Sequence, residues 1–73
     1  MFDQESLSDG PQLTTREREI LVLVARGLST KEVAQQVEIA PRTVDRHIEN
    51  ARLKLGAKNR THMVARAIIE GLL

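Results

Sequence analysis

The segment 41–55, PRTVDRHIENARLKL, constrains the fold most, because its apolar residues follow the spacing of a helix. These residues are separated by four, three and four positions, and they are Val44, Ile48, Ala51 and Leu55. At about 100° per residue they occupy one narrow face of a helix. The opposite face carries long side chains with hydrogen-bonding ends: Arg42, Arg46, Glu49 and Asn50. Such a face can read base edges in a major groove, although a charged helix face is more often only solvated.

A chain of 73 residues forms one small domain, near the lower limit for folding around a single core. It contains no cysteine, and its two histidines are fifteen positions apart, so we expect no metal site and no cofactor. Phe2 is the only aromatic residue, which argues against a stacking platform for single-stranded nucleic acid. Neither a membrane span nor a signal pattern is evident, and a cytoplasmic setting is therefore expected.

The net charge of +1 hides an uneven distribution along the chain. Residues 1–11 carry three acidic and no basic residues, whereas residues 12–73 carry eleven basic and seven acidic residues. Within 42–66 there are seven basic and two acidic residues. A basic surface concentrated in one half of a small domain suits a polyanion, but it would also suit an ordinary solvated surface.

Four amphipathic segments predict a compact all-α domain over residues 13–73. The expected helices cover about 15–26, 30–37, 41–55 and 60–70. The short second helix, a three-residue turn and the longer third helix form a helix-turn-helix. Residues 1–12 lack apolar periodicity, and we interpret them as a flexible acidic leader or linker.

The predicted helix starts have recognisable caps. The first two helices each begin with a hydroxyl residue followed three positions later by a glutamate, which is the capping-box spacing: Thr14 with Glu17, and Ser29 with Glu32. Pro41 suits the first position of the third helix, although Ala40 before it offers no side-chain cap. Asn59 can cap the fourth helix. Glu17 falls on the inward face, where a structural role is expected and a basic partner would be needed.

The last helix carries two apolar stripes. Val64, Ala67 and Ile68 are expected to face the core. The second stripe consists of His62, Ala65, Ile69 and Leu72. A domain of this size cannot cover both sides of its last helix, so the second stripe is a candidate dimer interface. Alternatively, Ile69 and Leu72 complete the core.

Several motifs in the expected order resemble the LuxR-type helix-turn-helix domain, also called the FixJ or GerE type. The motifs are Leu-Thr-x-Arg-Glu at 13–17, Gly-Leu-Ser-x-Lys-Glu-Val-Ala at 27–34, Thr-Val-x-x-His at 43–47, Lys-Leu-Gly at 54–56 and Asn-Arg at 59–60. The resemblance covers about residues 12–73. It implies a bacterial transcription regulator with a four-helix domain, whose third helix enters the major groove and whose last helix dimerises.

The resemblance also implies roles for single residues. The positions facing the bases are Asp45, Arg46 and Glu49. Arg46 could bind guanine and Glu49 could accept from cytosine, or Glu49 could pair with Arg46 or Arg42 and only orient it. The phosphate candidates are Thr30, Lys31, Arg42, Thr43, Asn50 and Lys54. For Lys54, a solvated lysine is an equally good interpretation.

Three further residues have simpler expected roles. His47 flanks the apolar stripe and is expected to be packed, with its ring hydrogen-bonded. Met63 is expected at the edge of the core. Leu53 points away from the apolar stripe, and the sequence gives no account of it beyond a chance exposure or a contact with a neighbouring domain.

The sequence therefore predicts sequence-specific binding of double-stranded DNA by a bacterial transcription regulator. A homodimer through the last helix would require an inverted-repeat site, and RNA polymerase is a further candidate partner. Binding would take place in the cytoplasm, at the nucleoid. The alternative is a stand-alone interaction domain that heterodimerises with a larger family member and inhibits its DNA binding. An enzyme is not expected, because no catalytic constellation is present in the sequence.

Overall fold

The computed structural model describes residues 12–73. It contains four helices over this range: α2 (Thr15–Ala25), α3 (Thr30–Val37), α4 (Pro41–Lys54) and α5 (Arg60–Ile69). The predicted all-α class is confirmed, and each predicted helix agrees with the observed one to within one residue. The predicted leader, apart from Gln12, lies outside the described residues.

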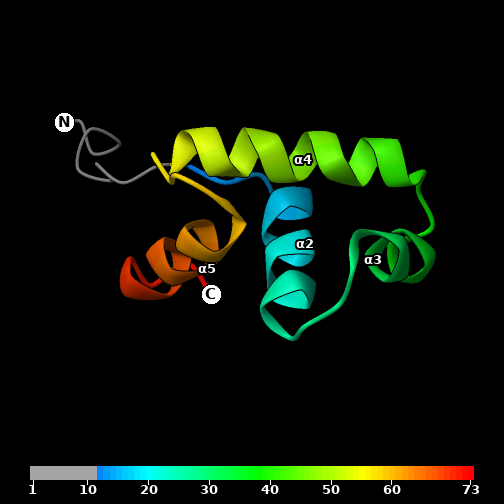
Figure 1. Cartoon of the computed structure of the whole chain (residues 1–73), viewed down its shortest axis with the longest axis horizontal. Helices are drawn as coiled ribbons and strands as arrows, with labels where there is room; N and C mark the ends of the chain where they lie inside the picture. The colour runs from blue at the N-terminus through cyan, green and yellow to red at the C-terminus, as the bar shows by residue number, and fades with distance from the viewer. Residues whose placement is uncertain (1–11) are drawn as a thin grey trace, which may run out of the picture.

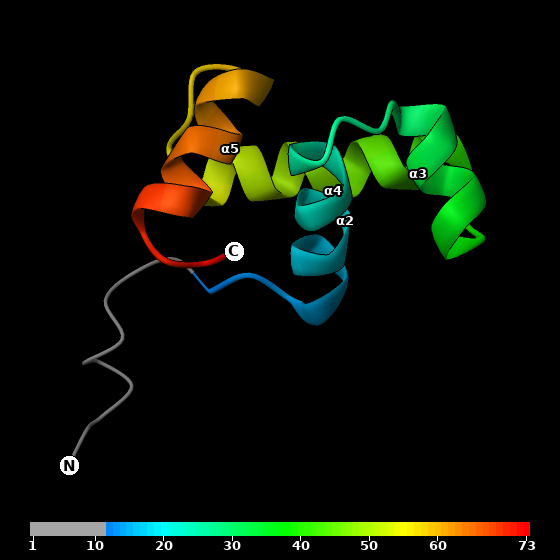
Figure 2. The ribbon, with the colours of Figure 1, turned by 90° about the horizontal axis from the view of Figure 1, so that it is seen from below.

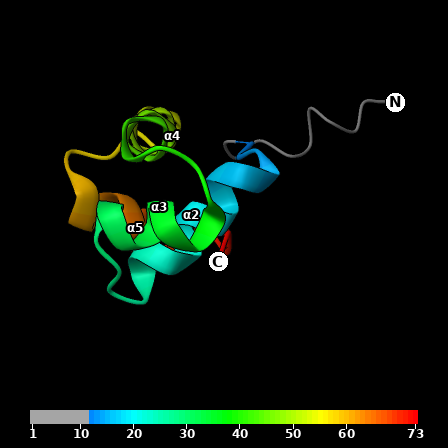
Figure 3. The same ribbon diagram turned by 90° about the vertical axis from the view of Figure 1, so that its right-hand side faces the viewer.

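Helix α4 lies along one side of the domain, and the other three helices support it from the opposite side (Figure 1). Helix α2 crosses the middle of α4, while α3 and α5 lie beneath its two ends (Figures 1 and 2). All three supporting helices contact α4. Viewed along α4, no other described element covers its outer side (Figure 3). The arrangement therefore presents one full face of α4 to the outside.

The buried face of α4 is the apolar stripe seen in the sequence. Val44, Ile48, Ala51 and Leu55 are all buried. Their partners in the core come from each supporting helix, and include Ile20, Leu21, Val33, Met63 and Ala67. Full burial of a large apolar side chain contributes about 1.5–3 kcal/mol. Packing on three helices therefore fixes both the position of α4 and its rotation about its own axis.

Two expectations for α5 are wrong. Met63 is fully buried in the core rather than at its edge, and Ile68 is 59% exposed rather than inward. The cap is the predicted one, since the Asn59 side chain accepts from the His62 N–H at 2.8 Å. The side chains of Met63 and Ala67, four positions apart, face the core together.

The caps form as predicted. Thr14 Oγ1 accepts from the Glu17 N–H at 3.0 Å, and the Glu17 carboxylate accepts from the Thr14 N–H at 2.9 Å. Ser29 and Glu32 form the same reciprocal pair at the start of α3. Ala40 gives α4 no side-chain cap, and Pro41 occupies the first turn.

The turn between α3 and α4 contains a feature that the sequence did not indicate. Glu38 ends α3 in the left-handed conformation, with φ 58° and ψ 45°. A residue with a Cβ atom pays about 1–2 kcal/mol for this backbone geometry. The left-handed residue turns the chain sharply, and the partly buried Ile39 then packs against the core. The turn thereby sets the angle between α3 and α4.

Candidate nucleic-acid interface

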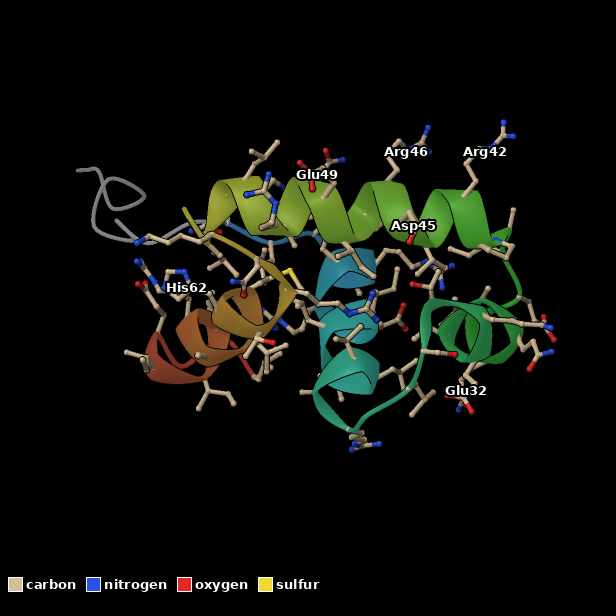
Figure 4. All side chains as sticks on the ribbon, in the orientation of Figure 1. Glu32, Arg42, Asp45, Arg46, Glu49 and His62 are labelled. Carbon is tan, nitrogen blue, oxygen red and sulfur yellow. The ribbon has the colours of Figure 1, made fainter. Side chains whose placement is uncertain are left out.

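The outward face of α4 presents two arginines that have no partner within residues 12–73. Arg42 and Arg46 are exposed, and the structure gives neither guanidinium a hydrogen bond or an ion pair over that range. Figure 4 shows both side chains extending away from the body of the domain. Four positions separate them, so they project from the same face one turn apart. This face can therefore offer two planar, multi-donor cations to a ligand.

Glu49 lies on the same face but is held by a neighbour. Arg52 Nε donates to Glu49 Oε1 at 3.0 Å, and Arg52 Nη2 donates to Glu49 Oε2 at 2.6 Å. Arg52 also donates to the carbonyl oxygen of Ala57 at 2.8 Å. The hydrogen bonds from Arg52 hold the pKa of Glu49 below its usual value, and the same bonds raise the pKa of Arg52. Glu49 therefore pairs with Arg52 and not with Arg46 or Arg42, which was one of the two alternatives, and both of these arginines stay available.

Asp45 points toward α3, not outward with Arg42 and Arg46 (Figure 4). Its carboxylate accepts a hydrogen bond from Thr30 Oγ1 at 3.2 Å. The Thr30 hydroxyl in turn accepts from Arg60 Nη1 at 3.1 Å, and Arg60 Nη2 lies 3.5 Å from the Leu28 carbonyl oxygen. Asp45 would have to give up this hydrogen bond to contact a base, so its base contact stays a prediction. Asp45 ends a chain of polar contacts that joins α5, α3 and α4.

The start of α3 retains donors for an anion. The backbone N–H groups of Thr30 and Lys31, in the first turn of α3, donate no hydrogen bond to any acceptor within residues 12–73. The Lys31 side chain is exposed. The Asp45 carboxylate next to Thr30 partly offsets the positive end of the helix dipole. The α3 terminus can therefore bind a phosphate, but less strongly than it would without Asp45.

Lys54 has a partner inside the domain. Its ammonium lies 2.8 Å from Oε1 of Glu17, which is 3% exposed. Burial raises the pKa of Glu17, but hydrogen bonds from Lys54 and Thr14 outweigh this effect and hold the pKa below its usual value. The basic partner expected for Glu17 is thus Lys54. A phosphate would have to compete with Glu17 for this ammonium.

Three predicted residues remain: Asn50 and Thr43 as phosphate contacts, and His47 as a packed residue. Asn50 is exposed and Thr43 is half-buried, so both can be reached from outside. His47 is half-buried as expected, but its Nδ1 atom is buried without a hydrogen-bond partner within residues 12–73. The expected hydrogen bond of the ring is therefore missing at that atom.

The predicted dimer stripe on α5 is only partly exposed. Ile69 is 78% exposed and Ala65 is also exposed. His62 Nδ1 accepts from the Lys58 N–H at 2.9 Å, which ties His62 to the preceding loop. Leu72 turns back and packs against the core after Gly71, whose φ is 73°. The exposed apolar surface of α5 therefore centres on Ala65 and Ile69, with Ile68 beside them.

Two arginines whose contacts were not predicted from the sequence hold the polar side chains of this surface in place: Arg52 and Arg60. Arg52 lies three positions after Glu49, a spacing that was visible in the sequence. Arg60 lies 30 positions after Thr30, and no local pattern indicates that contact.

Within residues 12–73 there is no cluster of three or more potential metal ligands, and no helix there is long and apolar enough to span a membrane.

The short helix α3, the Glu38 turn and the outward-facing α4 define a helix-turn-helix domain. The family described as "Bacterial regulatory proteins, luxR family" matches residues 11–67 of the chain. The protein therefore belongs to the LuxR family of bacterial regulatory proteins. It is a DNA-binding domain of the transcription-regulator type, and the resemblance seen in the sequence is confirmed.

Relatives of this chain differ greatly in length. The spore germination protein GerE of Bacillus subtilis is 39% identical over 70 residues, which cover 96% of this chain and 95% of GerE. The transcriptional activator protein SolR of Ralstonia solanacearum is 44% identical over 61 residues, or 84% of this chain. The match spans only 26% of SolR. The chain thus spans about a quarter of SolR and nearly all of GerE.

Solved structures show the same fold. The transcription factor GerE superposes with a TM-score of 0.78 at 41% identity, over 81% of this chain and 88% of GerE. A response regulator, ChrA of a heme-sensing two-component system, superposes with a TM-score of 0.82 at 35% identity. That match covers 85% of this chain and 31% of ChrA.

Proposed function

We propose that this chain binds double-stranded DNA in a sequence-specific manner, with α4 in the major groove, and regulates transcription as a dimer. The observation that carries the proposal is the unpartnered pair Arg42 and Arg46 on the outer face of α4. The back of α4 is fixed by three helices, so the arginines are presented on a rigid support. A rigid helix with outward arginines is suited to reading base edges.

Base reading rests mainly on Arg46. Its guanidinium can donate to O6 and N7 of a guanine, and no acid within residues 12–73 competes for it. Glu49 could accept from the amino group of a cytosine only by sharing its carboxylate with Arg52. Asp45 has no base-reading role in this proposal, because its carboxylate is directed to Thr30.

The phosphate contacts would flank the reading face. Lys31 and the free N–H groups at the start of α3 supply one contact. Arg42, Thr43 and Asn50 supply others along α4. Because each neutralised phosphate releases counterions, binding should weaken steeply with salt. Lys54 contributes less, since it is paired with Glu17.

Dimerisation would use the exposed apolar residues of α5, namely Ala65 and Ile69 together with Ile68. A two-fold dimer would bind an inverted repeat with half-sites about ten base pairs apart. The setting would be the bacterial cytoplasm, at the nucleoid, with RNA polymerase as a candidate partner of the bound dimer.

Selection of duplexes from a random pool, followed by binding titrations, tests this proposal. Arg46→Ala should lower the specific affinity by about 1–3 kcal/mol and relax the preference at one base pair. The matched control is Arg26→Ala, which removes an equal charge at the exposed end of α2 that lies far from α4 (Figure 1). Equal weakening of all sequences by Arg46→Ala would remove this residue from base reading.

A second candidate is an inhibitory partner that heterodimerises with a larger family member. The exposed Ile68 and Ile69 would suit such pairing. The two acidic residues that motivated this alternative, Asp45 and Glu49, are both engaged within the domain, which weakens its basis. Titration against promoter DNA at low and moderate salt separates the two: an inhibitor alone would show no saturable binding at either salt concentration.

A further inference from the structure

One exposed apolar residue stands apart from the others. Leu53, Ile68, Ile69 and Leu73 are the large apolar side chains that are exposed within residues 12–73. Three of them belong to α5 or the residues after it, where a partner surface is already proposed. Leu53 alone lies on α4, and it is 62% exposed.

The helical position of Leu53 coincides with that of the outward-facing residues. Arg42, Arg46, Glu49 and Leu53 are spaced by four, three and four, so they fall within about a sixth of a turn. Helix α4 runs unbroken from Pro41 to Lys54, which preserves this phase over its whole length (Figure 1). Leu53 therefore projects in nearly the same direction as Arg46, two turns further along the helix.

We infer that Leu53 is a further base-contacting residue, which reads the C5-methyl group of a thymine in the same major groove. This inference rests on the proposed function. The thymine methyl is the apolar group that a base pair presents in the major groove, and an aliphatic side chain is its matching contact. Seven residues at about 1.5 Å each separate Leu53 from Arg46 by about 10.5 Å. At about 3.4 Å per base pair, the thymine lies at most about three base pairs from the position contacted by Arg46, because α4 follows the inclined groove.

The surroundings of Leu53 favour a DNA contact over a protein contact. One turn before it on the same side are Asn50 and the ion-paired Glu49. Gly56, three positions later, adds no apolar side chain. A protein interface needs a contiguous apolar patch of several side chains, whereas a methyl contact needs only one. The single leucine among polar neighbours therefore fits the methyl group of a base better than a protein surface.

The test compares thymine with uracil in duplexes selected by the 73-residue chain. Uracil keeps the Watson–Crick pairing and the major-groove acceptor but lacks the methyl group. Each thymine of the selected site is replaced in turn, and binding is measured by fluorescence anisotropy. The expected result is a loss of about fourfold at one thymine per half-site, the factor that corresponds to one buried methyl group. In Leu53→Ala, the thymine and uracil duplexes should bind equally.

A control is Leu73→Ala, which truncates another exposed aliphatic side chain, beyond the end of α5. Whatever it does to absolute affinity, it should preserve the ratio between thymine and uracil duplexes. Equal binding of the two duplexes by the unaltered chain, or an unchanged ratio in Leu53→Ala, overturns the inference while the proposed function stands. Failure to select any duplex refutes the proposed function, and the inference with it.

Discussion

Replacing Lys54 by alanine removes the ammonium that lies 2.8 Å from the carboxylate of Glu17. Glu17 is 3% exposed and would keep its cap bonds with Thr14, so its charge would be only partly satisfied. A buried charged acceptor that lacks one of its hydrogen-bond donors lowers the free energy of unfolding by about 1–3 kcal/mol. Lys54 is itself partly exposed, which places the expected loss near the middle of this range, at about 2 kcal/mol. For a domain of this size, the melting temperature should fall by about 8–16 °C.

The assay is thermal unfolding followed by circular dichroism at several pH values. In the unaltered chain the pKa of Glu17 is lowered by folding, so this stabilisation is present above the ordinary glutamate pKa and is lost as the pH falls below it. A protonated Glu17 does not need the ammonium. The stability difference between the variant and the unaltered chain should therefore be full at pH 7 and shrink below about pH 4.5.

The control for this experiment is Lys58→Ala, which removes an exposed lysine from the loop before α5 and keeps its backbone N–H bond to His62. It should unfold like the unaltered chain. A destabilisation by Lys54→Ala of less than about 0.5 kcal/mol, the usual range for surface substitutions, or one that is the same at pH 7 and pH 3, would refute the reasoning. A DNA titration at low temperature adds a second readout, in which Lys54→Ala should change the salt dependence little because the ammonium is paired with Glu17.

Two other substitutions test separate parts of the structure. Lys31→Ala should weaken binding to all duplexes alike and reduce the magnitude of the salt slope by about one, as measured by titration over a salt series; a change in sequence preference would contradict a phosphate role. Glu38→Gly should raise the free energy of unfolding by about 0.5–1 kcal/mol, measured in urea, because glycine adopts the left-handed geometry without strain; a loss of stability would show that the Glu38 backbone is not strained.

The local features of this fold could be predicted because each depends on residues three or four positions apart. The capping boxes at Thr14 and Ser29, and the apolar stripe of α4, were enough to fix the helix bounds to within a residue. The face of α5 that turns to the core was harder to predict, since its residues offered one apolar stripe and a second, weaker one. Met63, which belongs to neither stripe, is fully buried in the core together with Ala67, and only the folded chain shows this.

The polar contacts of the candidate site were less predictable. Lys54 and Glu17 are 37 positions apart, and Arg60 and Thr30 are 30 apart, so only the folded chain brings them together. Glu49 had arginines three positions away on both sides, and spacing alone does not choose between them. The observed partner is Arg52, which the Ala57 carbonyl also holds in place.

The contact between Arg60 and the start of α3 has a consequence for how two subunits would sit on DNA. Arg60 is the first residue of α5, and its guanidinium fixes that end of the helix to Thr30. In a dimer formed through α5, the separation and twist between the two α4 helices would thus be nearly inflexible. One base pair inserted at the centre of the operator would shift one half-site by about 3.4 Å and rotate it by about 34°. The pair of subunits could not follow that rotation, so operator spacing should be recognised as strictly as operator sequence.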